Sequence, residues 1–370
     1  MTASAQPARP LRHAPRNFAL TPLNVYWEMT RACALACRHC RAEAMPHPHP
    51  LQLSFEESLR FLRQIPDFGD PLPQLILTGG DPLVRPDLLD LVDAARALSI
   101  PVSITPSATP TLTRAMLTAL KAHGVEALGL SLDGSDALRH DAIRGIEGTY
   151  TRTMEAMEWA AELAMPLQIN TLVAAETADD LPAIYALLMT KQVARWSLFF
   201  LISVGRGRVL QPLKPAQAEQ LMSWIYHTAQ HAPFAVATTE APSYRRVALG
   251  EMRAAGLNGE QIQRTPIGRG FGIRDGNGIV FVSNTGDICP AGFLPLAAGN
   301  VRDDHLVRVY RESPLFAALH DPAQFGGRCG RCEYRSICGG SRARAYAASG
   351  DPLAEDPLCL YQPARAAIVN

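Results

Sequence analysis

The chain has 370 residues, a length at which one large domain or two domains are expected. Its 35 basic residues balance its 35 acidic residues, so net charge gives no reason to expect a nucleic acid or an acidic membrane as a partner. No apolar run is long enough to cross a bilayer, so we expect no membrane partner.

The first residues contain several arginines but no apolar segment of the kind found in signal peptides. We therefore expect residues 1–20 to form a disordered tail and the protein to be cytoplasmic. In that compartment, eight cysteines indicate metal binding or catalysis rather than disulfides. They form two groups, one ending at Cys40 and the other starting at Cys289, which suggests two metal-binding regions.

Strands and helices are predicted to alternate from residue 23 to about residue 240. Segments with strand-like composition lie at 23–30, 74–78, 102–105, 127–132, 167–173, 196–203 and 234–238. Helices are predicted after them, for example at 86–98 and 113–123. Such alternation predicts an α/β fold in which helices cover parallel strands. Six strand–helix units are fewer than the eight of a closed barrel.

A different pattern begins after the last of these strands. Turn-forming residues precede a strand predicted at 279–283, and a second short strand ends at Cys289. The two strands predict a β-hairpin. We therefore divide the chain into a barrel at 21–240 and a smaller C-terminal region at 241–370.

Three cysteines, Cys33, Cys37 and Cys40, follow the first predicted strand in the spacing C-x3-C-x2-C. Three thiolates on one short loop can hold three corners of a cubane iron–sulfur cluster, whereas an electron-transfer cluster normally takes four cysteines. The fourth iron would be open to a small molecule, which suggests catalysis. Loops after the strands carry the chemistry in barrels of this kind. The alternative is a zinc site or a set of unconnected reduced thiols.

This cysteine spacing after a first strand resembles the signature of the radical S-adenosylmethionine (SAM) superfamily. The resemblance implies a partial (β/α)6 TIM-type barrel, open on one side, in which SAM binds the open iron of a [4Fe–4S] cluster. It also implies that one electron from the cluster cleaves SAM to a 5′-deoxyadenosyl radical, which removes a hydrogen atom from the substrate. A flavodoxin- or ferredoxin-type protein is the expected reductant.

Further motifs at predicted strand ends match segments of the same family. Gly79, Gly80 and Asp81 follow the second strand, where two glycines let the backbone approach a ligand closely. The resemblance assigns this turn to the amino group of SAM, although many relatives carry Glu in place of Asp81. The other SAM contacts that the resemblance implies are His39, Ser107, Ser131, Asp133, Arg144 and Asn170.

Each of these segments also has a simpler interpretation. The glycine turn could be an ordinary strand-to-helix connection, Asp133 could cap a helix, and Arg144 could lie on the surface. The segment Gly205-Arg206-Gly207, after the sixth strand, resembles a family loop close to adenine, but other glycine-rich turns look alike.

The C-terminal region carries Cys329, Cys332, Cys338 and Cys359. Four thiolates suit a closed site, and zinc would take them as readily as a cubane cluster. The region resembles the C-terminal extension of the SPASM/twitch subgroup, which implies that these cysteines hold one auxiliary [4Fe–4S] cluster. The full subgroup pattern has more cysteines, so Cys289 is expected to be free or an unusual ligand. A zinc knuckle that only stabilises the fold is the alternative.

We therefore expect a radical SAM enzyme with a bulky substrate, either a peptide in post-translational modification or a tetrapyrrole in cofactor biosynthesis. The segment 338–351 resembles the heme-pathway and pyrroloquinoline quinone branches. Residues 204–275 are expected to line part of the substrate pocket. The alternative is a non-catalytic iron–sulfur protein that senses redox state or carries electrons, although neither role needs an open iron.

Overall fold

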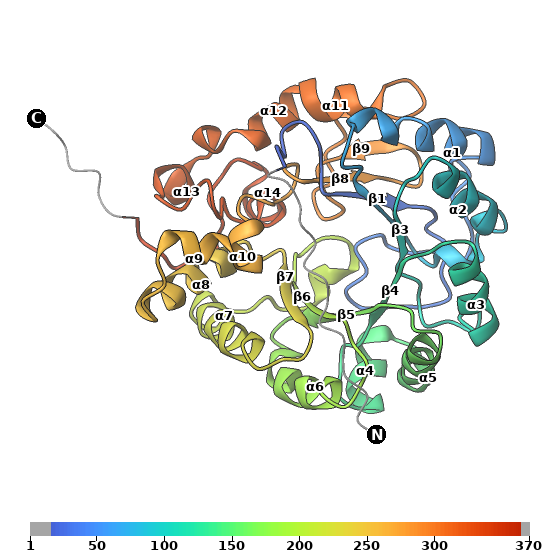
Figure 1. Cartoon of the computed structure of the whole chain (residues 1–370), viewed down its shortest axis with the longest axis horizontal. Coiled ribbons are helices and arrows are strands. Elements are labelled where there is room, and N and C mark those ends of the chain that lie inside the picture. Colours follow the sequence, from blue (N-terminus) through green and yellow to red (C-terminus); the bar gives the residue numbers. More distant parts are fainter. Residues whose placement is uncertain (1–15, 364–370) are drawn as a thin grey trace, which may run out of the picture.

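A computed structural model describes residues 16–363 of the chain (Figure 1). Its first part contains seven parallel strands arranged in chain order in one curved sheet. These strands are β1 (Asn24–Glu28), β2 (Gln74–Thr78), β3 (Val102–Ile104), β4 (Ala127–Ser131), β5 (Leu167–Val173), β6 (Arg195–Phe200) and β7 (Ala235–Thr239). All seven predicted strands are confirmed, although β6 ends at Phe200 rather than at residue 203.

Helices between the strands cover the outer side of the sheet (Figure 1). The longer ones are α1 (Phe55–Leu62), α2 (Leu88–Ala97), α3 (Arg114–Ala122), α4 (Ala137–Arg144), α5 (Thr149–Glu162), α6 (Leu181–Leu188), α7 (Pro215–Ala229) and α8 (Ser243–Ala254). Short helices follow in the C-terminal region: α9 (Gly259–Gln263), α10 (Pro266–Arg269), α11 (Leu306–Glu312), α12 (Pro314–His320), α13 (Gly327–Arg331) and α14 (Arg342–Ser349). Single 3-10 turns are η1 (Ile65–Phe68), η2 (Pro82–Val84), η3 (Ala178–Asp180), η4 (Gly205–Val209) and η5 (Pro322–Gln324).

The predicted hairpin is present, and it extends the barrel sheet. Strand β8 (Ile279–Val282) pairs in parallel with β1, while β9 (Asp287–Cys289) pairs antiparallel with β8 and with the short β10 (Gly299–Asn300). The strand order is β10-β9-β8-β1-β2-β3-β4-β5-β6-β7, so β7 and β10 are the two edges. The sheet therefore stays open, as a partial barrel requires. Sequence patterns place the hairpin in the C-terminal region but do not reveal its pairing with β1.

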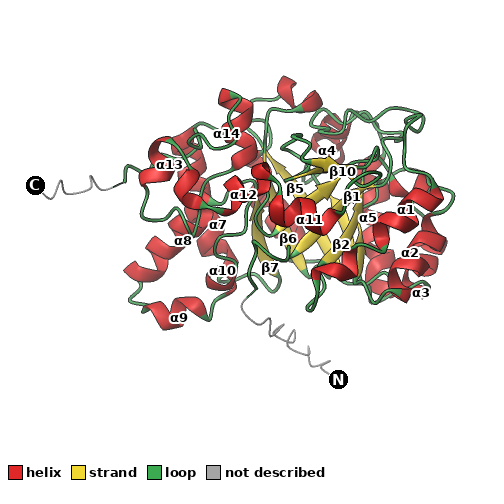
Figure 2. Cartoon of the chain, turned by 90° about the horizontal axis from the view of Figure 1, so that it is seen from above, coloured by secondary structure: helices red, strands yellow, loops and turns green. Residues whose placement is uncertain are grey.

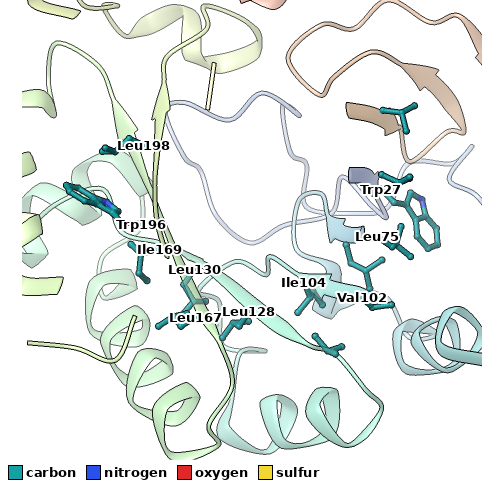
Figure 3. Close-up of a cluster of buried hydrophobic side chains, with 14 of the residues drawn as sticks. Trp27, Leu75, Val102, Ile104, Leu128, Leu130, Leu167, Ile169, Trp196 and Leu198 are labelled. Carbon is teal, nitrogen blue, oxygen red and sulfur yellow. The ribbon is translucent and has the colours of Figure 1, made fainter. Parts of the chain in front are cut away.

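Apolar side chains of the strands point toward the helices and form the main core. Trp27 of β1 is fully buried, and its ring packs edge-on against Phe61 of α1 with 5.2 Å between ring centres. Figure 3 shows how equivalent apolar residues, among them Leu75, Leu130 and Trp196, continue this layer from strand to strand. Because side chains alternate across a strand, the residues between them face the inside of the barrel.

The inner face of the sheet is largely polar. Gln74 donates to Ser103 Oγ at 2.9 Å, Gln168 donates to Asn170 Oδ1 at 2.8 Å, and Tyr26 lies on the same face of β1. Branched apolar residues usually fill a closed barrel of this type. A polar interior in a partial barrel instead provides a place for a polar ligand.

Backbone hydrogen bonds continue beyond the ends of β1 and β2. Met29 N donates to Thr78 O at 2.8 Å, and Gly80 N donates to Thr30 O at 2.7 Å. A Cβ atom on Gly80 would lie 2.4 Å from the carbonyl oxygen of Ala32, so only glycine fits without displacing the backbone. The loop after β1 is thereby fixed against the turn after β2.

The two ends of the chain lie partly outside the described residues. Of the tail predicted at 1–20, residues 1–15 are not described, and the remainder contacts the body of the protein. Arg16 Nη1 donates to Pro22 O at 2.7 Å, and the hydroxyl of Tyr310 donates to the carbonyl of Phe18. None of the described helices is long and apolar enough to cross a membrane.

The close approach at Gly80 predicts the effect of adding a single methyl group. Gly80→Ala should lower the free energy of unfolding by roughly 1–3 kcal/mol, because neighbouring backbone atoms must move. Gly250→Ala is the matched control, since Gly250 lies in α8 with nothing within 4 Å of the added Cβ. The control should be neutral or slightly stabilising. Denaturant unfolding measures the free energy of unfolding of both variants. Equal values would contradict the close packing of the glycine turn against the loop after β1.

Candidate functional site

The loop after β1 carries the first cysteine group. Cys37 is buried, while Cys33 and Cys40 are partly exposed. Cys33 N donates to Met45 O at 2.9 Å, and Met45 N donates to Arg31 O at 3.0 Å. The returning chain therefore fixes the loop where it leaves the strand.

Arg206 of η4 fastens the same loop from the opposite side of the barrel. Its Nε atom donates to Cys37 O at 3.1 Å, Nη1 donates to Ala44 O at 3.2 Å, and its backbone N donates to Cys40 O at 3.1 Å. In sequence, this segment resembles a family loop near adenine. Its contacts with the cysteine loop are not predicted. The available signal is an arginine between two glycines directly after a strand.

Each sulfur of the group lies near a polar partner. Cys33 Sγ lies 3.5 Å from Ser107 Oγ and accepts from Leu35 N at 3.3 Å, and Cys40 Sγ accepts from Ala44 N at 3.4 Å. Burial raises the pKa of the Cys33 thiol, and the contacts with Ser107 and Leu35 oppose the rise. Donors directed at sulfur stabilise a metal-bound thiolate.

Asp81 is fully buried, and protein groups satisfy its carboxylate. It accepts from the hydroxyls of Thr109 at 2.6 Å and Thr111 at 3.0 Å, and from the backbone N–H groups of Leu83 at 3.2 Å and Ser107 at 3.4 Å. Burial raises its pKa, and these hydrogen bonds counteract the effect. Asp81 therefore fixes the turn after β3, from which Ser107 Oγ donates to the carbonyl oxygen of the neighbouring glycine turn at 2.8 Å.

A buried ion pair lies beside the cysteine loop. Arg144 Nε is 3.0 Å from Asp133 Oδ2, and Arg144 Nη1 is 3.6 Å from Cys37 Sγ. Burial acts to lower the pKa of Arg144, but the charges of Asp133 and Cys37 outweigh it and raise the pKa overall. Asp133 also accepts from Leu172 N at 2.7 Å. The guanidinium is therefore held in place as a permanent cation next to the cluster loop.

Two buried nitrogen atoms at this ion pair have no hydrogen-bond partner within residues 16–363: Nη2 of Arg144, a donor, and Nδ1 of the His39 ring. Burial lowers the pKa of His39 to about 4, so its ring is neutral near pH 7, and its Nε2 atom lies 4.0 Å from Asp133. An unpaired buried donor costs about 1–3 kcal/mol. A guanidinium donor left unpaired beside three cysteines suits a polar ligand with a carboxylate, as SAM has.

The predicted SAM residues come together at the carboxyl ends of the strands. Ser107 connects the β3 end to the cysteine loop and to the glycine turn, and Arg144 connects α4 to the same loop. Ser131 and Asn170 are register partners on β4 and β5 and face the interior. Asn170, a polar residue in an apolar run, has its partner in Gln168. The residues named by sequence thus form one continuous region.

The second cysteine group encloses a cavity in the C-terminal region. Cys329, Cys332, Cys338 and Cys359 all line a space of about 30 Å³. A cavity needs about 10–15 Å³ to hold one water molecule, so this space is larger than one water molecule needs. The four thiols surround a shared space, an arrangement that suits a multi-atom cluster.

Cys289 does not belong to this second group. It lies on β9 opposite Phe281, and it is absent from the cavity lining. Burial raises the pKa of its thiol to about 12, with smaller contributions from the charges of Asp287 and Glu28. Like the other seven cysteines, all of which lie in the described residues, Cys289 forms no disulfide.

The C-terminal region meets the barrel at Glu240, directly after β7. This residue has a left-handed backbone with φ of 59°, and its carboxyl accepts from Ser341 Oγ at 2.6 Å. Burial and the charge of Asp275 raise its pKa well above the usual value. Arg344 donates to the Glu240 carbonyl at 2.7 Å. Sequence patterns indicate only a turn at Asp275. That its carboxyl lies beside the carboxyl of Glu240 is seen only in the structure.

Comparisons with known proteins agree with this site. Residues 27–188 match the Radical SAM superfamily. The AdoMet-dependent heme synthase of Nitratidesulfovibrio vulgaris is 34% identical, with 97% of this chain and 98% of that protein covered. The protein of the same name from Methanosarcina barkeri is 33% identical, with 93% and 98% covered. The PqqA peptide cyclase of Rhizobium meliloti is 28% identical, with 98% and 92% covered.

Two solved structures share the fold. Streptococcus suis SuiB bound to S-adenosylmethionine has a TM-score of 0.70 at 19% identity, covering 92% of this chain and 78% of that one. The structure of anSMEcpe with bound AdoMet has a TM-score of 0.68 at 16% identity, covering 91% and 94%. At these identities the likeness supports the partial-barrel architecture alone.

The similar proteins are named synthases and cyclases, which supports an enzyme over the alternative of a redox carrier. The match to the Radical SAM superfamily supports a [4Fe–4S] cluster and SAM as cofactors. Relatives that match over almost their whole length, together with the cysteine loop at the mouth of a partial barrel, show that the chain belongs to the radical SAM superfamily.

Proposed function

We propose that this radical SAM enzyme acts on a tetrapyrrole and takes part in heme synthesis. The observation that carries the proposal is the match to AdoMet-dependent heme synthases at 33–36% identity along nearly the whole chain, C-terminal region included. A second candidate is peptide modification, which is supported by the similarity to PqqA peptide cyclases at 28–29% identity. The higher identity favours the tetrapyrrole.

Polar side chains also lie on the inner face of the barrel near the amino ends of the strands, the end opposite the cysteine loop. Gln74, Gln168 and Asn24 place amide groups on its inner face. Tyr26 lies among them. Burial raises its pKa overall, and the Asn24 hydrogen bond and the charge of Arg195 only partly oppose the rise. Because these groups lie away from the cysteine loop, they do not favour either substrate class.

Cys33, Cys37 and Cys40 are proposed to hold the [4Fe–4S] cluster, which together with SAM supplies the radical chemistry of the family. Arg206 keeps the cysteine loop in position. Arg144, oriented by Asp133, is proposed to donate its free Nη2 hydrogens to the carboxylate of SAM. Hydrogen bonds from a charged guanidinium to a carboxylate are short and strong.

The remaining predicted site residues are proposed to shape the pocket around SAM. Gly79 and Gly80 present backbone atoms to its amino group, while Asp81 acts through Ser107 because its own oxygens are already occupied. We propose contacts to the nucleoside for His39, Ser107, Ser131, Asp133 and Asn170.

We propose that the four C-terminal cysteines hold one auxiliary [4Fe–4S] cluster. Their shared cavity and its connection to the barrel through Ser341 and Glu240 support this assignment. We retain the division into a barrel at 21–240 and a cluster-bearing region at 241–370. A flavodoxin- or ferredoxin-type reductant and a cytoplasmic location complete the proposal.

The substrate class is tested by anaerobic incubation with SAM, a reductant and Fe-coproporphyrin III, the compound named in one relative. Chromatography and mass spectrometry should show loss of the porphyrin, formation of heme and release of 5′-deoxyadenosine. Release of 5′-deoxyadenosine with the porphyrin unchanged would contradict the tetrapyrrole proposal and favour a peptide.

The cysteine assignments are tested by comparing two single substitutions. Cys33→Ala should lose one cluster's worth of iron and sulfide and all SAM cleavage, because the first cluster loses a ligand. Cys289→Ala should keep both, since Cys289 lines neither site. Iron and sulfide analysis of anaerobically reconstituted protein gives the answer, and equal metal content in the two variants would refute the assignment.

The role of Arg144 in SAM binding is tested by comparing two substitutions on α4. Arg144→Met should weaken SAM binding at least about tenfold, because charged hydrogen bonds contribute about 1.5–3 kcal/mol. Arg139→Met is the control, since Arg139 also lies on α4 but forms an exposed ion pair with Asp179. The SAM dissociation constant is measured by the change that SAM causes in the EPR spectrum of the reduced cluster. Similar constants for both variants would remove Arg144 from the site.

A further inference from the structure

The carboxylate of Glu28, at the end of β1, contacts an arginine on each side of the first cysteine group. Arg41 Nη1 donates to Glu28 Oε2 at 2.8 Å, and Arg31 Nε donates to Oε1 at 3.4 Å. Arg31 lies two residues before Cys33, and Arg41 directly follows Cys40. Glu28 is 1% exposed and Arg41 is 17% exposed, so their ion pair is stronger than one in water. One buried carboxylate thus ties the two ends of the cysteine segment together.

The side chain of Arg41 also lies against the C-terminal region. Its guanidinium carbon is 4.6 Å from the ring centre of Phe281 on β8 and 6.0 Å from that of Phe293, and aromatic faces attract cations. A Cβ atom on Gly292, in the loop between β9 and β10, would lie 2.9 Å from Arg41 Nε. The guanidinium therefore fills a space that exists because residue 292 has no side chain.

Sheet pairing explains why these distant segments meet. Strand β8 lies next to β1, with Phe281 opposite Tyr26 (Figure 1). Residues opposite one another in neighbouring strands share a face of the sheet, as do residues two apart along one strand. Phe281, Tyr26 and Glu28 therefore all face the barrel interior. Arg41 reaches this face from the cysteine loop and contacts the last strand of the barrel's first unit and the C-terminal region at once.

The backbone beside Arg41 is held from a second direction by η4. Arg206 N donates to Cys40 O at 3.1 Å. A Cβ atom on Gly205 would lie 2.7 Å from the carbonyl oxygens of both Cys40 and Arg41, so the two segments pack closely. With its backbone fixed by η4 and its side chain fixed by Glu28, Arg41 has one arrangement available, and so has the neighbouring Cys40.

We propose that Arg41, held by Glu28 and by the loop at Gly292, is a positioning residue for the first cluster, through which the C-terminal region supports SAM binding. The proposal rests on the cluster and SAM site of the proposed function. Arg41 acts through the adjacent Cys40, and all three cysteine ligands remain when it is replaced. Its loss should therefore change the affinity for SAM more than the metal content.

Gly292→Ala tests this connection from the C-terminal side, because the added methyl group must displace the guanidinium while every cysteine stays in the chain. We expect the SAM dissociation constant to rise about tenfold, the effect of losing one charged hydrogen bond, with iron and sulfide content unchanged. Gly250→Ala is again the matched control, since nothing lies within 4 Å of its added Cβ. This control should keep the parent dissociation constant.

A double-mutant cycle tests whether Arg41 and Glu28 act together, and it decides the question if Gly292→Ala yields too little folded protein. Arg41→Met and Glu28→Gln should each weaken SAM binding about tenfold. The double variant should bind SAM no more weakly than the single variants, because all three lose the same contact. Arg41→Lys keeps a cation beside Glu28 and should bind SAM more tightly than Arg41→Met.

The dissociation constants are measured from the change that SAM causes in the EPR spectrum of the reduced protein, together with iron and sulfide analysis. Parent-like constants in Gly292→Ala and Arg41→Met, at full iron and sulfide content, would overturn the role of Arg41. Losses that multiply in the double variant would show that Arg41 and Glu28 act separately and would also overturn the proposal. No effect of SAM on the spectrum of the parent protein would instead refute the SAM site of the proposed function.

Discussion

The docking of the loop after β1 onto the turn after β2 is the constraint on which the rest of the site depends. Two backbone hydrogen bonds, from Gly80 N to Thr30 O and from Asp81 N to Ala32 O, prolong the parallel ladder into the loops. They fix the start of the cysteine loop relative to the glycine turn. Figure 2 shows the strands at the centre of the molecule with helices on both sides. Since the contact uses backbone atoms, it needs glycine more than any particular side chain.

Both cysteine regions contain buried charged side chains, and the same physical effect explains them. A buried ion adds little net stability even when paired, yet it holds its neighbours in a defined arrangement. Asp133 and Arg144 form such a pair beside Cys37 and leave one guanidinium nitrogen unused. In the second region, Arg342 Nη2 lies 3.7 Å from Cys329 Sγ. In both places the protein supplies positive charge where an anionic ligand or cluster would balance it.

The open edge of the sheet explains how the two parts of the chain are coupled. A closed barrel would bury β7 between neighbours, whereas here its end is free to contact Ser341 and Arg344 (Figure 1). Glu240 adopts an uncommon left-handed conformation at this point, as residues at functional positions often do. The C-terminal region thus lies against the barrel interior rather than being a separate appendage.

The sequence by itself determined the strands, the cysteine groups and the family, because these depend on local composition and on spacings of a few residues. It also singled out Arg144 and Asp133 as candidates, through their resemblance to family segments, and the structure pairs them. Only the tertiary structure decided that Arg206 fastens the cysteine loop, that β8 pairs with β1 and that Asp81 is already saturated by hydroxyls. The physical reason is that these contacts join residues far apart in the chain. Their pairing depends on strand order, register and the direction of side chains, which no local pattern encodes.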